Sequence, residues 1–148
     1  MLMDPKLNGY LTRALNHEMA AVQLYLTQST LCQYWGLQQA ADQFRHESED
    51  ELGHAQRLIG RMLSLGLLPR ATQLPAVSAC RSLKDMLVAD WHLEAEAIRL
   101  YDEASQYAAR IRDEESFKLF TELLLEEREH LESLEKWLAE LEQSGNGG

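Results

Sequence analysis

Two stretches of this 148-residue chain carry the same polar and aromatic residues at the same spacing. A shift of 76 residues relates four pairs: Glu18 and Glu94, Tyr25 and Tyr101, Glu51 and Glu127, His54 and His130. The remainder of the two halves is dissimilar, so the match falls on residues that a purely apolar core does not require. The repeat therefore predicts two similar structural units that present the same chemical groups.

Both units are predicted to be helical. Strand signals are nearly absent, since the chain has only three Val and no alternating apolar run. Asp4-Pro5 begins the first apolar-periodic stretch, and Gly36 and Gly66 end the first two. We expect helices over residues 5–35, 37–65, 83–111 and 114–143, followed by a flexible Gly-rich tail at 144–148.

The lengths of the connections indicate how these helices pack. Tight turns make the first pair and the last pair antiparallel hairpins, whereas residues 66–81 form a longer connection. At roughly 3.3 Å per residue this segment can reach about 53 Å, which exceeds the roughly 45 Å length of a 30-residue helix. We therefore predict one all-α domain over 1–148, a ferritin-like four-helix bundle with a long crossover. An up-down bundle with one oversized loop is the alternative.

Charge and composition exclude several classes of function. The chain has 14 Lys and Arg against 24 Asp and Glu, a net charge of −10, which disfavours nucleic acid and anionic membrane surfaces as partners. No apolar run approaches the roughly 20 residues of a membrane span, and the first residues lack a signal-peptide pattern. Two isolated cysteines, Cys32 and Cys80, exclude a zinc ribbon or a disulfide framework. We expect a cytoplasmic protein.

Six polar residues interrupt the otherwise apolar stripes of the four predicted helices. They lie near the middle of their helices, so they should meet at one level of the bundle whichever way each helix runs. These residues are Glu18, Glu51, His54, Glu94, Glu127 and His130.

Burying four carboxylates together requires compensation, because each ionised group costs several kcal/mol and like charges oppose one another. Two divalent cations balance the four negative charges directly. Glu51 with His54, and Glu127 with His130, are i, i+3 pairs on one helix face. Mixed carboxylate and imidazole ligands without thiolate favour Fe(II) or Mn(II). The pattern predicts a dinuclear metal site, with two Fe ions per subunit and Mn or Zn as substitutes.

Longer sequence spans resemble the bacterioferritin family over nearly the whole chain. These spans are His17-Glu18, Tyr34-Trp35-Gly36-Leu37, His46-Glu47-Ser48-x-Asp50-Glu51-x-x-His54-Ala55, Asp90-x-x-x-Glu94 and Glu126-Glu127-x-x-His130. The resemblance implies terminal ligands at Glu18 and Glu94, bridging ligands at Glu51 and Glu127, and one iron each for His54 and His130. It implies ferroxidase activity with O2 or H2O2, and iron storage in a cytoplasmic 24-subunit shell.

The resemblance also implies roles outside the six ligands. Tyr25 corresponds to a tyrosine near the centre that can supply an electron. His46 and Asp50 correspond to ligands for an iron on the inner surface of the shell. A small ferredoxin-like protein is the implied reductant that releases stored iron.

Two departures from the family pattern change what we expect. Leu52 occupies the position of the family's haem-ligand Met, so we expect no haem in a homo-oligomer. A mixed shell with a separate haem-binding subunit is the alternative. The family's short fifth helix has no counterpart before Gly148, so we expect wider four-fold openings if the shell forms.

A different class of function competes with storage. A non-storage di-metal oxidoreductase, such as a rubrerythrin-like peroxidase or a manganese catalase, uses a similar ligand set. The chain has no four-cysteine rubredoxin segment, and the spans above match bacterioferritins better. A DNA-protecting mini-ferritin is disfavoured by the net charge and by the presence of all six ligands in one chain.

Overall fold

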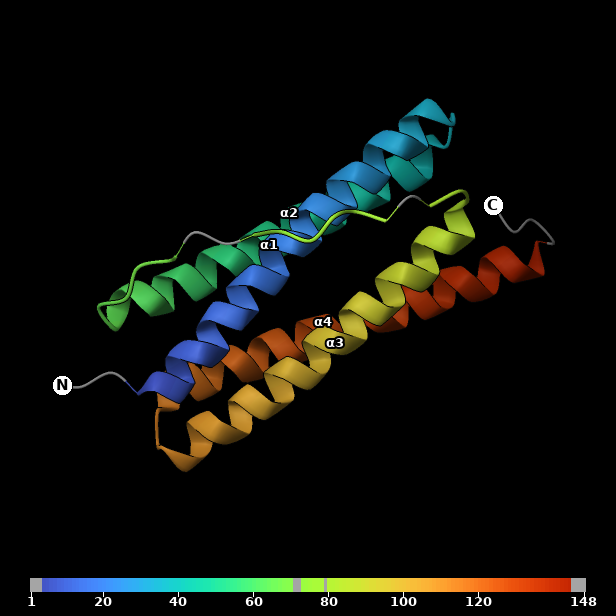
Figure 1. The fold of residues 1–148 in the computed structure, drawn as a ribbon. Helices are drawn as coiled ribbons and strands as arrows, with labels where there is room; N and C mark the ends of the chain where they lie inside the picture. Colours follow the sequence, from blue (N-terminus) through green and yellow to red (C-terminus); the bar gives the residue numbers. More distant parts are fainter. Residues whose placement is uncertain (1–3, 71–72, 79, 145–148) are drawn as a thin grey trace.

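The computed structural model describes residues 4–70, 73–78 and 80–144. Its four helices are α1 (Pro5–Tyr34), α2 (Gln38–Ser64), α3 (Leu83–Arg110) and α4 (Glu114–Gln143). They form a four-helix bundle of two antiparallel hairpins, α1–α2 and α3–α4 (Figure 1). The predicted fold class is therefore confirmed.

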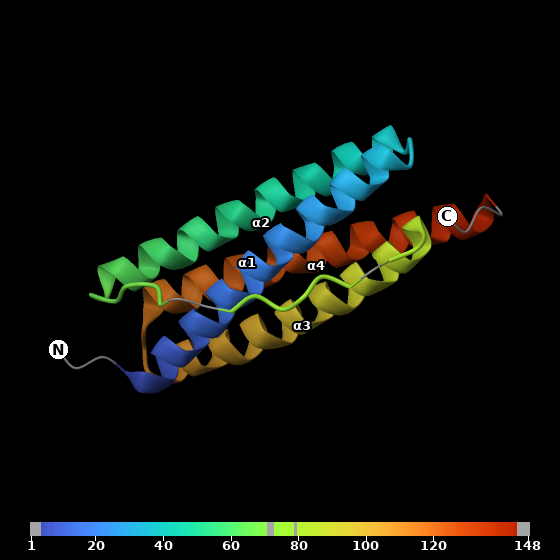
Figure 2. The ribbon, with the colours of Figure 1, turned by 45° about the horizontal axis from the view of Figure 1, so that its top comes forward.

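The connection between α2 and α3 runs along the length of the bundle, over α1, from one end to the other (Figures 1 and 2). As a result α3 begins at the end of the bundle opposite to the end of α2. This path is the ferritin-like crossover, and it excludes the up-down arrangement. Residues 71, 72 and 79 of the predicted 66–81 connection, and 145–148 of the predicted tail, lie outside the described residues.

Local sequence determines where the helices begin and end. The side chains of Asp4, Ser82 and Asp113 accept hydrogen bonds from backbone N–H groups in the first turns of α1, α3 and α4. Gly36 and Gly66 both have φ +76°, the left-handed conformation that ends a helix.

Several helix boundaries lie one residue inside the predicted ranges, at Tyr34, Gln38, Ser64 and Arg110. The reason is that the closing turn takes up the last predicted position of α1, α2 and α3. No described helix is long and apolar enough to cross a membrane.

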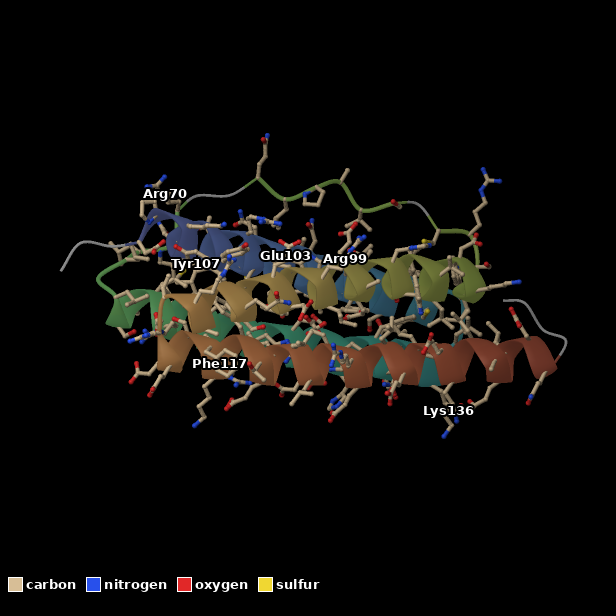
Figure 3. The ribbon with its side chains drawn as sticks, turned by 90° about the horizontal axis from the view of Figure 1, so that it is seen from below. Arg70, Arg99, Glu103, Tyr107, Phe117 and Lys136 are labelled. Carbon is tan, nitrogen blue, oxygen red and sulfur yellow. The ribbon has the colours of Figure 1, made fainter. Side chains whose placement is uncertain are left out.

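Two apolar clusters fill the bundle, one toward each end. The first surrounds Leu11, Tyr101 and Phe120, and the second surrounds Tyr25 and Phe44. Charged side chains project outward, as Lys136 does from α4, while Tyr107 lies between α3 and the start of α1 (Figure 3). There the Tyr107 hydroxyl donates to Asp4 Oδ1 at 2.7 Å. The polar residues of the candidate site separate the two clusters.

Candidate metal centre

The structure brings together the six polar residues that interrupt the apolar stripes. Helices α1 and α3 each contribute one Glu, and α2 and α4 each contribute a Glu and a His one turn apart. All six are buried except His130, whose side chain is 14% exposed. Their nitrogen and oxygen atoms form two overlapping groups, each compact enough to hold a cation.

The first group consists of Glu18, Glu51, His54 and Glu127. His54 Nδ1 lies 2.8 Å from Glu127 Oε1, 2.9 Å from Glu18 Oε2 and 3.7 Å from Glu51 Oε2. One imidazole nitrogen thus faces three carboxylates supplied by three helices.

The second group consists of Glu51, Glu94, Glu127 and His130. His130 Nδ1 lies 3.0 Å from Glu51 Oε1, 3.8 Å from Glu127 Oε1 and 3.9 Å from Glu94 Oε2. The two imidazole rings are nearly parallel, at 14°, with centroids 5.8 Å apart. Glu51 and Glu127 belong to both groups, so they are placed to bridge two cations, while Glu18 and Glu94 each serve one.

The charges in this centre are incompletely compensated by the protein. Burial opposes protonation of the imidazoles, but the carboxylates around them outweigh it and raise the pKa of His54 to about 12 and that of His130 to about 9. Burial raises the pKa of Glu127 to about 7 and that of Glu18 well above its ordinary value. Without a metal, bound protons on these side chains compensate the negative charge.

Hydrogen bonds within the protein do not complete the compensation of these buried charges. Seven buried atoms of the centre have no hydrogen-bond partner among the described residues: Glu18 Oε1, both oxygens of Glu51, Glu94 Oε2, both oxygens of Glu127, and His130 Nδ1. Native proteins leave few such atoms unsatisfied, and each costs roughly 1–3 kcal/mol. A donor set of carboxylates and imidazoles with open lone pairs fits a pair of divalent first-row cations.

A third group adjoins the centre through the other nitrogen of His130. Its Nε2 lies 3.6 Å from Asp50 Oδ2 and 3.8 Å from Glu47 Oε2, and Glu47 Oε2 is buried without a partner among the described residues. The predicted inner-surface residue His46 is exposed, with Nε2 3.8 Å from Asp50 Oδ2. Asp50 therefore lies between His46 and the centre. Glu47 was missed as a member, although it is one turn from Asp50 on the stripe of α2.

A polar pocket of about 340 Å³ opens onto the centre between α2 and α4. Its lining includes both imidazoles and four carboxylates: His54, His130, Glu49, Asp50, Glu126 and Glu129. Arg57 lines it too and donates to Glu126 Oε2 at 2.7 Å and to Glu122 Oε2 at 2.5 Å. The pocket gives cations an acidic approach to the imidazoles.

Tyr25 is in direct contact with the centre. It is fully buried, and its hydroxyl donates to Glu94 Oε1 at 2.7 Å. Burial, and then the charge of Asp90, raise the Tyr25 pKa well above its ordinary value. Tyr25 is therefore linked by one hydrogen bond to a candidate ligand.

Asp90 and Gln28 form a buried polar pair on the Tyr25 side, which the sequence did not indicate. Gln28 Nε2 donates to Asp90 Oδ1 at 2.7 Å, and Asp90 is completely buried. Burial raises the Asp90 pKa to about 8, with the Gln28 hydrogen bond opposing it and the charge of Glu47 adding to it. Asp90 is thus predicted to be a neutral acid at pH 7.

Asp90→Asn should stabilise the metal-free protein against urea, relative to the natural chain, increasingly as pH rises from 5 to 8. Above about pH 4 the unfolded state loses the Asp90 proton, while the folded state keeps it because folding raises the pKa. The free-energy cost of natural Asp90 therefore grows with pH up to about pH 8 and is constant above it. We expect a relative gain of about 2 kcal/mol, roughly half of the full linkage, since neighbours relax. Asp102→Asn, at an exposed position of α3, is the control. Parallel pH profiles for the natural and Asp90→Asn proteins would show that Asp90 is ionised.

Comparison with known proteins agrees with this fold. The family model for the ferritin-like domain matches residues 8–144. Bacterioferritin of Rhodobacter capsulatus is 32% identical over 98% of this chain and 90% of its own length. Bacterioferritin of Brucella melitensis is 32% identical, covering 96% and 88%, and the bacterial ferritin of Synechocystis is 32% identical, covering 95% and 91%.

A solved structure gives the same result in three dimensions. The 2.6 Å structure of Rhodobacter capsulatus bacterioferritin superposes with a TM-score of 0.92 at 31% identity, covering 97% of this chain and 89% of that one. That structure has a metal-free dinuclear site and a haem iron in a crystallographic special position.

The bundle, the crossover and the paired carboxylate–histidine groups define a ferritin-like protein. Within that class, the chain belongs to the bacterioferritin family. Its relatives support a function in iron storage with ferroxidase activity, and none of them favours the alternative of a non-storage di-metal oxidoreductase.

Proposed function

We propose that this chain oxidises Fe(II) to Fe(III) at an intrasubunit di-iron centre and deposits the product as mineral inside a homo-oligomeric shell. The observation that carries the proposal is the sharing of Glu51 and Glu127 between two histidine-containing groups. Such sharing brings two Fe(II) ions together, and two ions supply the two electrons that convert O2 to hydrogen peroxide, or hydrogen peroxide to water.

The protein contributes charge, geometry and a dry environment. Four carboxylates neutralise two divalent ions, and they favour Fe(III) further because each oxidation adds one positive charge. Glu51 and Glu127 fix the spacing of the ions, while His54 and His130 each belong to one group and line the pocket. The apolar clusters on either side exclude water from the reacting pair.

Three further residues belong to the proposal. Full reduction of O2 to water takes four electrons, so Tyr25 would supply one of the two that the iron pair lacks, and an Fe(II) on the inner surface the other. The hydroxyl proton of Tyr25 passes to Glu94, the acceptor of its hydrogen bond. A tyrosyl radical signal that appears in freeze-quenched samples and is absent from Tyr25→Phe checks this role. Asp50 and His46 bind iron on the inner surface, where Asp50 faces His130 Nε2 and so continues the centre outward.

The assembly we propose is a cytoplasmic 24-subunit shell. A ferredoxin-like protein is the proposed reductant for iron release. Leu52 is half exposed on α2 and offers no sulfur ligand, so we propose a haem-free homo-oligomer and a separate haem-binding subunit wherever haem is found. Mn or Zn substitutes at the same ligands.

An anaerobic Fe(II) titration of metal-free protein, followed by O2, tests the proposal. We expect about two Fe(II) per chain, rapid oxidation, a mass near 24 chains by light scattering, and no haem absorption band. Two Fe(II) per chain in a dimer would retain the di-iron centre and contradict storage. Fewer than one Fe(II) per chain would contradict the di-iron centre.

A further inference from the structure

A second tyrosine lies at the centre, related to Tyr25 by the internal repeat. Tyr101 is completely buried on α3, and its ring lies 6.3 Å from that of Phe120. Tyr25 has the corresponding partner, since its ring lies 6.3 Å from that of Phe44. The shift of 76 residues relates Phe44 to Phe120 as well. Each apolar cluster therefore places one tyrosine next to the polar centre.

The two tyrosine hydroxyls differ in their hydrogen bonding. Tyr25 donates to Glu94 Oε1, whereas the Tyr101 hydroxyl is buried without a partner among the described residues. The side chain beside Tyr101 is Glu18, the repeat counterpart of Glu94. After burial, the charge of Glu18 raises the Tyr101 pKa most, and Glu18 also acts on it as a hydrogen-bond acceptor, although the hydroxyl meets no acceptor at full hydrogen-bond geometry. Glu18 Oε1 also has no partner, so an unsatisfied buried donor lies next to an unsatisfied buried acceptor.

The reason for the missing bond is the position of Glu18 in the metal-free protein. Its other oxygen, Oε2, lies 2.9 Å from His54 Nδ1, and this contact orients the carboxylate toward the imidazole. A cation bound in the first group occupies His54 Nδ1 and so takes the place of its contact with Glu18. The carboxylate is then free to meet the Tyr101 hydroxyl.

We propose that Tyr101 is a positioning residue for Glu18, donating a hydrogen bond to that carboxylate when a divalent cation occupies the first group. The inference rests on the proposed di-metal function and extends it to a residue outside the ligand set. Tyr101 and Tyr25 then hold the two non-bridging carboxylates in the same way, one for each metal position.

The test compares Tyr101→Phe with the natural 148-residue chain in two measurements that do not depend on catalysis. The first is an anaerobic titration of metal-free protein with Co(II), followed by its visible absorption. The second is urea unfolding of the metal-free protein. Tyr25→Phe is the matched variant on the other side, and Tyr10→Phe, in the same apolar cluster and about two helical turns from Glu18, is the remote control.

We expect Tyr101→Phe to weaken one of the two Co(II) sites about tenfold, the effect of losing a hydrogen bond to a charged group, and to leave the other unchanged. In urea its midpoint should rise, because the substitution removes an unsatisfied buried hydroxyl. Tyr25→Phe should weaken one Co(II) site as well but lower the urea midpoint, since it breaks an existing hydrogen bond. Tyr10→Phe should bind Co(II) as the natural chain does.

A packing role alone would raise the urea midpoint of Tyr101→Phe and leave both Co(II) affinities unchanged, which would overturn the inference while the proposed function stood. Natural protein that bound fewer than one Co(II) per chain would overturn both. A Tyr101→Phe protein with a lowered urea midpoint would overturn the inference too, because it would reveal a hydrogen bond already present without metal.

Discussion

The double substitution of Glu51 and Glu127 by Gln should slow rapid Fe(II) oxidation about 100-fold or more. These two carboxylates are the ones that both cation groups share, so their loss affects both metal positions at once. Gln preserves the shape of each side chain but leaves only Glu18 and Glu94 to balance four positive charges. Loss of two charge-assisted contacts, at about 1.5–3 kcal/mol each, corresponds to roughly 10²- to 10⁴-fold in rate.

The measurement is stopped-flow absorbance after mixing Fe(II)-loaded protein with O2. Glu132→Gln, at an exposed position of the same helix as Glu127, is the matched control and should react at the natural rate. Glu18→Gln and Glu94→Gln should have smaller effects, because each of these residues belongs to one group only. A double variant that kept the rapid phase would place the reaction outside this centre.

Divalent metal should stabilise the fold by about 5 kcal/mol when two redox-inert ions, such as Zn(II), are present at about 100 times their dissociation constants. For a chain of this size, that gain raises the melting temperature by about 10 °C or more. The physical reason is that the metal-free centre holds several buried carboxylate oxygens without hydrogen-bond partners among the described residues, and the cations satisfy them. Calorimetric melting with and without Zn(II) measures the effect, and the Gln double variant should lose most of it.

The same binding should depend on pH with a defined sign. At pH 7 both His54, with a pKa of about 12, and His130, with a pKa of about 9, carry a proton that a metal must displace. Affinity should therefore increase between pH 6 and pH 8, by about tenfold per pH unit for each proton released. Above about pH 9 the slope should fall as His130 loses its proton. An affinity independent of pH would show that the imidazoles are neutral in the metal-free protein.

The sequence predicted the fold well because the signals involved are local. Helix caps such as Asp4 and Ser82, and the glycine that follows α1, specify the helix ends to within a residue. The common level of the six polar residues followed from their middle positions, and their places on the apolar stripes predicted that they face inward.

Other features of the site depend on side-chain direction between helices, which periodicity does not specify. The approach of Glu47 and Asp50 to His130 Nε2 requires the actual rotation of α2 against α4. The Gln28–Asp90 pair joins helices across the bundle, and its members lie 62 residues apart. The Tyr101 hydroxyl lacks a partner among the described residues because of how the Glu18 carboxylate is oriented, and no sequence pattern specifies that orientation.

Because the long crossover is the only chain connection between the two hairpins, bound ions can hold the hairpins together. Helices pack closely within each hairpin, but the hairpins meet each other less extensively, mainly through α1 and α3. Each cation group takes ligands from both hairpins, with Glu127 joining the first and Glu51 joining the second. Two ions thus act as a reversible cross-link between halves that the backbone connects only through a long segment. Separation of the hairpins should consequently be the opening motion that depends most strongly on iron supply. Hydrogen exchange of the backbone where α1 contacts α3 should report it.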